Sequence, residues 1–396
     1  MSVPVIKGAT GLDVVAAVPY CLGFEPEDCV VAVALMPPRG RLGPMWRADQ
    51  RGLRDAHVGP DLTTTLAAML QEVGAQGVFL IRYAPPGAPV ASRDPGLRAV
   101  QRALRGGPRT EAVWDVVGDT LCELHPVDLT PLGDVHGVAA LAETQTRAQF
   151  QAIGAKEPLG RRSDLTRFDP PPEAAARAAR RAERRALDKL SRAGQEAELT
   201  EWRLEAIALW RELVEQLRAD PAVALEPAVL GRAGAALYDC DSRDAVVALH
   251  MKEAADWPER LASGRAFLPP LLDPEVSEGV DPALVDTTDR LFREIIAYQP
   301  PRRRARALTA FATVQWWAGN GAATQELAAA ALRCPEPPSF AEVLLCSAAA
   351  MLFPRVLKAR AEAGRGLARG KGRARGTVRG GRAGRGQASG RPQRVA

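Results

Sequence analysis

The sequence predicts an α/β N-terminal sheet domain, followed by an all-α helical bundle and a disordered basic tail. Over about the first 120 residues, short apolar runs alternate with helical patterns, which is typical of a sheet covered by helices. After the prolines at 170–172 the strand patterns stop, and apolar residues recur every three or four positions. The end of the chain consists mainly of glycine and arginine. We therefore expect domains at 1–165 and 173–358 and a tail at 361–396.

The spacing of apolar residues predicts the first elements. Leu12, Val15 and Ala16 indicate a short helix, which we expect Pro19 to end. The run CVVAVAL at 29–35 is apolar at every position, which favours a strand buried on both faces. A second strand follows at the segment WRAD.

The next elements continue the alternation of helix and strand. A helix capped by Asp61 and stopped by Gly74 precedes the next strand, the apolar run GVFLIRYA at 77–84. A polar helix at 96–104 leads to a further strand at 111–117. The expected order is helix, strand, strand, helix, strand, helix, strand.

The second half shows helical patterns throughout. One apolar stripe consists of Ile207, Trp210, Val214 and Leu217. Asp281 is expected to cap a helix that the prolines at 300–301 close. A hairpin of two alanine-rich helices turns at 319–321, and SFAE at 339–342 matches a capping box. The hairpin resembles one tetratricopeptide-type unit, so we expect a bundle that is partly repeat-like.

Composition argues against a membrane protein, a secreted protein and a protein held by disulfides or zinc. No run of 18 apolar residues occurs and the start of the chain lacks a secretory pattern, so we expect a cytoplasmic protein that does not enter a membrane. The six cysteines are far apart and form no C-x-x-C pair, which favours buried thiols over disulfides or zinc ligands.

The charge is divided unevenly along the chain. Residues 361–396 hold ten basic residues and one acid, a net charge of +9. The other 360 residues hold 42 basic and 46 acidic side chains, a net charge of −4. The positive charge of the whole chain therefore comes from its tail.

Four segments, taken in this order, resemble a known family. They are VPYCLGFEPEDCVV at 18–31, WRAD at 46–49, RRSDLTRFDP at 161–170 and WWAGNGAATQELAAAAL at 316–332. The chain resembles the actinobacterial domain of unknown function 4192 (DUF4192) family, over residues 10 to about 355. The positions that match the family pattern are Pro19, Tyr20, Leu22, Gly23, Phe24, Pro26, Arg47, Asp49, Trp317, Gly319 and Gly321.

The resemblance implies an actinobacterial source and no particular activity. The chain departs from the family pattern after the expected strand at 111–117, where DTLCELHPVDLTPLG stands in place of an aromatic and cysteine-rich stretch. The tail lies outside the resemblance.

Two glycine-containing motifs do not predict a phosphate site. The tail segment ARGKGRARGT lacks the first glycine and the final Ser or Thr of a phosphate-binding loop. The segment GNGAAT at 319–324 lacks the third glycine of a dinucleotide fingerprint and joins two helices, which favours a simple turn.

Reactive side chains are also few. The four histidines are far apart and are expected in loops or at the surface. Cys29 beside Asp28 is a candidate nucleophile, although its place in an apolar strand favours packing. The segment ELHPVD offers Glu123, His125 and Asp128 as ligands but favours an exposed turn. We expect no catalytic residue, metal or cofactor, and an enzymatic activity is the less favoured alternative.

The clearest candidate site in the body is the pair Arg47 and Asp49. Alternation along a strand places both on one face and Trp46 on the other. Glu25 and Asp28 precede the neighbouring strand and are expected at an end of the sheet, where α/β proteins bind ligands. These four residues predict either a small-molecule or nucleotide site of an enzyme or sensor, or a structural ion pair.

The tail is the other candidate site. Its arginines are spaced by glycine with no aromatic residue among them, so we expect contacts to the phosphates of a nucleic acid without sequence specificity. The alternative is a solubilising end. The candidate contacts are Arg365, Arg369, Lys371, Arg373, Arg375, Arg379, Arg382, Arg385, Arg391 and Arg394. This predicts a non-enzymatic adaptor or binding protein, with the helical domain available to a protein partner.

Overall fold

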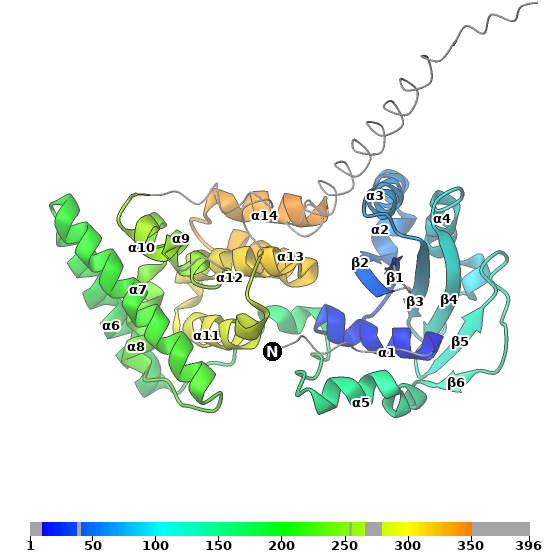
Figure 1. Ribbon diagram of the computed structural model, residues 1–396, viewed down its shortest axis with the longest axis horizontal. Coiled ribbons are helices and arrows are strands. Elements are labelled where there is room, and N and C mark those ends of the chain that lie inside the picture. The colour runs from blue at the N-terminus through cyan, green and yellow to red at the C-terminus, as the bar shows by residue number, and fades with distance from the viewer. Residues whose placement is uncertain (1–9, 38–40, 253–255, 266–278, 351–396) are drawn as a thin grey trace, which may run out of the picture.

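The computed structural model describes residues 10–37, 41–252, 256–265 and 279–350. An α/β sheet domain comes first and helices follow, as the sequence predicts (Figure 1). We call residues 10–152 the sheet half and residues 173–350 the helical half. The predicted tail at 361–396 lies outside the described residues.

The sheet half is built on one mixed sheet of six strands. The strands, in the spatial order β2-β1-β3-β4-β5-β6, are β2 (Arg41–Asp49), β1 (Cys29–Met36), β3 (Gly77–Ala84), β4 (Arg109–Val117), β5 (Thr120–Leu124) and β6 (His136–Gly137). Neighbouring strands are antiparallel except β3 and β4, which are parallel. The strands β2, β3 and β4 therefore run in the same direction and end at the same edge of the sheet. The sequence prediction missed β5 and β6.

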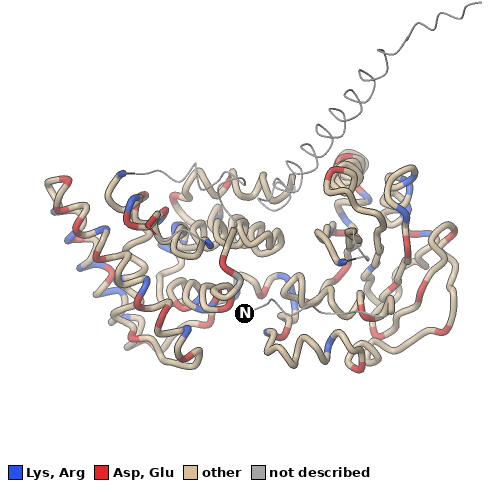
Figure 2. Tube along the Cα trace, in the orientation of Figure 1, with Lys and Arg blue, Asp and Glu red and all other residues tan. Residues whose placement is uncertain are grey.

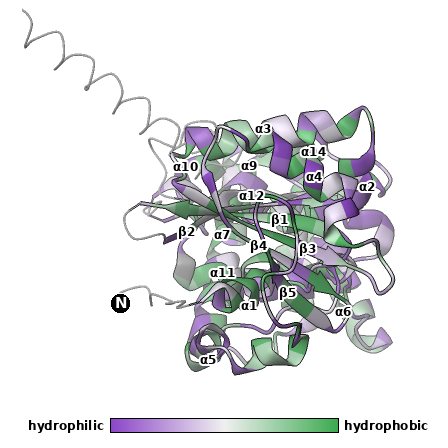
Figure 3. Cartoon of the chain, turned by 90° about the vertical axis from the view of Figure 1, so that its right-hand side faces the viewer, coloured by the Kyte–Doolittle hydropathy of each residue, from purple (hydrophilic) through white to green (hydrophobic). Residues whose placement is uncertain are grey.

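Helices cover both faces of this sheet (Figure 3). One face carries α1 (Gly11–Leu22) and α5 (Gln145–Ala152). The other carries α2 (Gln50–Arg54), α3 (Val58–Glu72) and α4 (Pro95–Ala103). Burial on both faces explains why β1 and β3 are almost wholly apolar.

Two helix boundaries differ from the prediction. The helix α1 continues past Pro19 to Leu22 and ends at Gly23, whose φ of 81° lies in the left-handed region. Most of α1 is buried, and this burial offsets the hydrogen bond that Pro19 removes. The helix α3 begins at Val58 rather than behind Asp61, because the Asp55 carboxylate accepts the backbone N–H groups of His57 and Val58.

The helical half consists of helices packed around an aromatic core. They are α6 (Glu173–Arg192), α7 (Glu196–Ala219), α8 (Pro227–Ala236), α9 (Cys240–Ala248), α10 (Trp257–Ala262), α11 (Val285–Tyr298), α12 (Ala305–Ala318), α13 (Gly321–Leu332) and α14 (Ser339–Ala349). Phe292 stacks on Phe311 with ring centroids 5.2 Å apart, and Trp210 packs against Phe292. None of the helices in the described ranges is long and apolar enough to cross a membrane.

The predicted hairpin of helices is formed by α12 and α13. Gly319 has a φ of 79° and ends α12, and the Asn320 side chain accepts the Ala323 N–H at the start of α13. The capping box predicted at 339–342 is wrong: α14 begins at Ser339 itself, with Pro338 at the cap position and no side-chain cap.

The helices α6 and α8 approach each other closely. Ala176, Ala179 and Ala182 form the buried stripe of α6. A side chain at Gly231 of α8 would collide with the carbonyl group of Ala179. Small residues on both helices therefore permit this packing, and they leave the opposite face of α6 at the outer edge of the molecule (Figure 1).

Candidate functional site

Arg47 and Asp49 lie at the end of β2 and share one face of it. The Arg47 Nη2 donates to Asp49 Oδ1 at 2.7 Å, while Trp46 and Ala48 are buried on the other face. The Arg47 guanidinium lies over the Phe24 ring, 5.6 Å from its centroid. Arg47 and Asp49 thus share one face of β2, as the alternation of side chains along a strand predicts. Ligand binding at this pair stays a prediction.

Glu25 and Asp28 lie in the turn before β1. The backbone of Glu25 is fixed by a hydrogen bond from its N–H to the Leu159 carbonyl. Asp28 has a φ of 39°, and its carbonyl accepts the Gln50 N–H. Both side chains are exposed, and among the described residues neither forms an ion pair with Arg47. The structure therefore brings two of the four predicted residues into direct contact.

Arg162 extends this pair to the helical half. It belongs to the short 3₁₀ helix η3 (Arg162–Thr166). Its Nη1 lies 3.4 Å from Asp49 Oδ2, its Nη2 donates to Gln325 Oε1 at 2.8 Å, and its Nε lies 2.7 Å from Glu326 Oε1. We call Arg47, Asp49, Arg162, Gln325 and Glu326 the junction cluster, because it joins the end of β2 to α13.

The junction cluster is suited to holding the two halves together. Both arginines already have carboxylate or amide partners, and Asp49 accepts from Arg47 while its other oxygen faces Arg162. Arg47 Nε and Arg162 Nε are buried without a hydrogen-bond partner, but the contacts between opposite charges stabilise the junction. This arrangement favours the structural ion pair over the ligand site.

Cys29, the candidate nucleophile, is fully buried in β1. Burial raises the pKa of its thiol to about 11, although the nearby Arg47 lowers it. Because the thiolate is the nucleophilic form, Cys29 is unreactive near neutral pH. Its role is packing.

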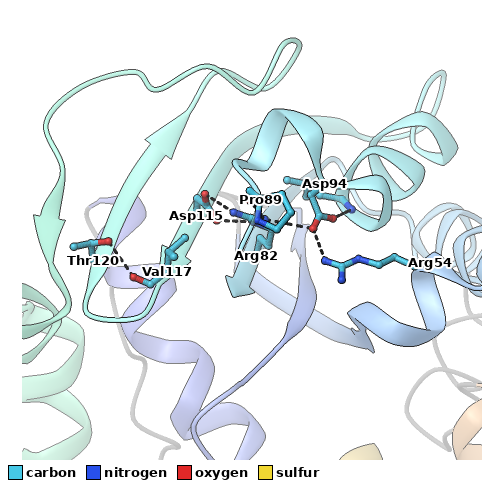
Figure 4. Close-up of polar contacts among 8 residues, drawn as sticks. Arg54, Arg82, Pro89, Asp94, Asp115, Val117 and Thr120 are labelled. Atoms are coloured by element: carbon cyan, nitrogen blue, oxygen red, sulfur yellow. Dashed lines mark hydrogen bonds and ion pairs between the residues drawn. The ribbon is translucent and has the colours of Figure 1, made fainter. Parts of the chain in front are cut away.

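A buried charged cluster that the sequence analysis missed lies on the other face of the sheet (Figure 4). Arg82 of β3 donates to both carboxylate oxygens of Asp115 on β4, at 2.7 and 2.9 Å. Its Nη1 donates to the Pro89 carbonyl at 2.8 Å and to Asp94 Oδ2 at 3.3 Å. Asp94 also accepts from Arg54 Nη2 at 2.9 Å. We call Arg54, Arg82, Asp94 and Asp115 the sheet cluster.

The sheet cluster lies where the parallel strands β3 and β4 end, the part of an α/β sheet at which ligands bind. The arginines and carboxylates of the cluster nevertheless form ion pairs with one another. Asp94 caps α4 by accepting the Leu97 N–H at 2.8 Å. Although burial alone raises the pKa of Asp94, the Leu97 N–H and the two arginines lower it overall. The cluster therefore fastens α4 and the loop before it to the sheet.

The sequence does contain a signal for this cluster. Arg82 and Asp115 are the charged residues within the apolar runs of β3 and β4, and charges are rarely buried without partners. Their pairing required knowing that β3 and β4 are adjacent and parallel, in the register that aligns Arg82 with Asp115.

The histidines differ in environment. His57, His125 and His136 lie in exposed or half-buried positions, and His125 Nδ1 is 3.1 Å from Asp128 Oδ1 in the expected turn. His250, expected at the surface, is instead fully buried beside Trp210 and Phe292. Within the described ranges no three His, Cys, Asp or Glu residues are placed to hold a metal ion.

Comparison with known proteins identifies the family. A family model described as domain of unknown function (DUF4192) matches residues 12–355. The chain belongs to the DUF4192 family. No curated protein and no solved structure gives a significant match.

The four segments that carry the DUF4192 resemblance meet at the junction cluster. Phe24 from the first segment lies under Arg47 from the second. Arg162 from the third contacts Asp49 from the second and Glu326 from the fourth. In this DUF4192 protein, the family pattern thus coincides with the contact between the two halves.

Proposed function

We propose that this DUF4192 protein is a non-enzymatic, nucleic-acid-binding adaptor of the actinobacterial cytoplasm. Its C-terminal residues 361–396 would hold the folded body on RNA or DNA without reading sequence. The observation that carries this proposal is the separation of charge between a tail of +9 and a remainder of −4.

The physical basis is the release of counterions from phosphates by the ten basic side chains of the tail. Glycines between the arginines let each guanidinium reach a phosphate independently. The absence of aromatic residues from the sequence after Arg365 removes the stacking platforms that bases prefer. Affinity without sequence preference is the expected result.

The contacts of the junction cluster and the sheet cluster support a non-enzymatic body. Their arginines and carboxylates are engaged with one another, and Cys29 is protonated near neutral pH. A nucleotide or metal that copurifies in stoichiometric amount would contradict this part of the proposal, and mass spectrometry of the purified protein tests it.

The nucleic-acid proposal is tested by fluorescence anisotropy on short single strands of several sequences. If five to eight tail cations reach phosphates, the logarithm of affinity falls against the logarithm of salt concentration with a slope of roughly −4 to −6. Replacing the ten basic residues of the tail by Gln should remove most of that slope. Equal affinity of both proteins at every salt concentration would show that the tail does not bind.

A further inference from the structure

The outward face of α6 carries a row of arginines. At 100° per residue, Arg177, Arg181, Arg184, Arg185 and Arg192 fall within an arc of about 100° on the helix, on the side opposite the buried alanines. All five side chains are exposed. Figure 2 shows basic residues along this outer edge of the helical half.

Most of these arginines have no acidic partner. Arg177 pairs with Glu173, but among the described residues Arg181, Arg184, Arg185 and Arg192 form no ion pair. Asp188 is the acidic residue within the same arc. The side of α6 on which these arginines lie depends on how the helix packs, which its own sequence does not determine.

The remaining acids of α6 leave the middle of this face free. Glu173 pairs with Arg177 and Arg180 at the start of the helix, and Glu183 is buried and lies 3.7 Å from Arg303. Lys189, at the border with α7, pairs with Glu205 at 2.6 Å. The free positive charge is therefore concentrated on the face that points away from the body.

The packing of α6 fixes this face in space. The alanine stripe and Gly231 hold α6 close to α8 along their contact. From Arg177 to Arg192 the helix rises about 22 Å, which corresponds to six or seven phosphate steps of roughly 3.4 Å along one strand of a duplex. The arginines thus form a rigid cationic ridge on the scale of a nucleic-acid backbone.

We propose that this ridge binds the phosphate backbone of a nucleic acid. The inference rests on the proposed function and extends it from the tail to the folded body. Arginine is suited to this role because its guanidinium contacts phosphate oxygens in pairs. The ridge has no apolar side chain to insert between bases, so its contacts are to phosphates and sugars.

A second copy of the chain is the competing partner. Beside α6, the α7 residues Glu196, Glu201 and Glu205 lie on one open, nearly flat surface. A two-fold pairing could set the basic ridge of one copy against this acidic side of another. The phosphate proposal is favoured because Lys189 already neutralises Glu205, which weakens the acidic side.

The test uses the full chain with Arg181, Arg184, Arg185 and Arg192 replaced by Gln. Its matched control replaces four exposed arginines at and near α4, namely Arg93, Arg98, Arg102 and Arg105. Anisotropy titrations on a duplex and a single strand cover salt concentrations from about 25 to about 200 mM. The salt slope should be smaller by about 3 for the α6 variant only, since each phosphate that an arginine neutralises adds roughly 0.7 to 0.9 to the slope. Asp188→Asn should strengthen binding.

The outcomes separate the alternatives. Equal losses in the α6 and α4 variants would overturn the proposal, because net charge alone would explain them. A change from dimer to monomer in light scattering, with nucleic-acid affinity unchanged, would assign the ridge to a second copy. The Gln-substituted tail tests the proposed function separately, so a loss only in that variant would leave the tail as the binding segment and reject the ridge.

Discussion

At the scale of single residues, the guanidinium of Arg82 joins two strands, a loop carbonyl and a helix cap. It is fully buried, as is Asp94, and Asp115 is nearly so. Two carboxylates and one buried arginine can coexist there because Arg54 adds a second positive charge at Asp94. Removing the central charge leaves two carboxylates facing each other in a medium of low polarity.

We expect Arg82→Met to lower the free energy of unfolding by about 3 to 5 kcal/mol, because it leaves buried charges without a partner. Urea unfolding followed by circular dichroism measures the change. Arg54→Met is the control: the Arg54 side chain is 41% exposed and Asp94 keeps the Leu97 N–H and Arg82 as partners, so its loss should cost clearly less than the loss of Arg82. Similar losses in both variants would show that the sheet cluster does not depend on Arg82.

His250 gives the protein a pH-dependent stability. Burial lowers its pKa from 6.5 to about 4, and its Nδ1 lies 2.8 Å from the Thr288 hydroxyl. As pH falls below 6.5, the unfolded chain takes up a proton that the folded protein excludes. The stabilisation is therefore complete above pH 6.5 and decreases towards pH 4.

Between pH 6.5 and pH 5 we expect the free energy of unfolding to fall by about 1.5 kcal/mol, with a slope that approaches roughly 1.4 kcal/mol per pH unit below pH 6. Urea titrations at half-unit intervals of pH measure this slope. His250→Gln should flatten it, whatever that substitution does to stability at pH 7. An unchanged slope in the variant would show that another titratable group causes the pH dependence of stability.

At the scale of elements, the close packing of α6 against α8 depends on the absence of a side chain at Gly231. The contact is between backbones, so no rotation of a side chain relieves a methyl group placed there. The helices α6 and α8 would have to separate along their length. That separation would also move the arginine ridge.

Gly231→Ala should therefore destabilise the helical half by about 1 to 3 kcal/mol through overpacking. The midpoint of thermal unfolding reports the effect. Gly133→Ala serves as the control, since an added Cβ at Gly133 meets nothing within 4 Å. An unchanged midpoint of thermal unfolding in Gly231→Ala would mean that α6 and α8 can separate at little cost.

The spacing of apolar residues predicted most helices and strands. The errors arise where contacts between residues far apart in the sequence decide the structure. The apolar runs of β1 and β3 and the stripe of α7 follow from burial alone. Pro19 was misjudged because tertiary burial outweighs its local effect. The junction cluster could be predicted only as far as Arg47 and Asp49, because Arg162 reaches them from 113 positions away.

At the scale of the whole molecule, the connection between the halves is anchored on the helical half. Arg293 Nη2 donates to the Leu165 carbonyl at 3.1 Å, and Phe168 lies under the guanidinium groups of Arg293 and Arg304. The boundary predicted between 165 and 173 falls in this connection, and Arg167 within it is exposed.

Limited trypsin digestion should remove the tail first and then cut near 161–172, giving two stable fragments. The expectation follows from the exposed Arg167 in the segment that connects the two halves. Mass spectrometry of the fragments locates their ends. First stable fragments that end far from this segment and from the tail would place the domain boundary elsewhere.

The position of β2 at the edge of the sheet affects how the protein behaves at high concentration. The outer side of β2 pairs with no other described strand, and such an edge can recruit strands from other molecules. Pro44 lacks an N–H to donate, Arg41 adds charge, and the register with β1 shifts between Val33 and Leu35. These features discourage the pairing of β2 with an edge strand of another molecule.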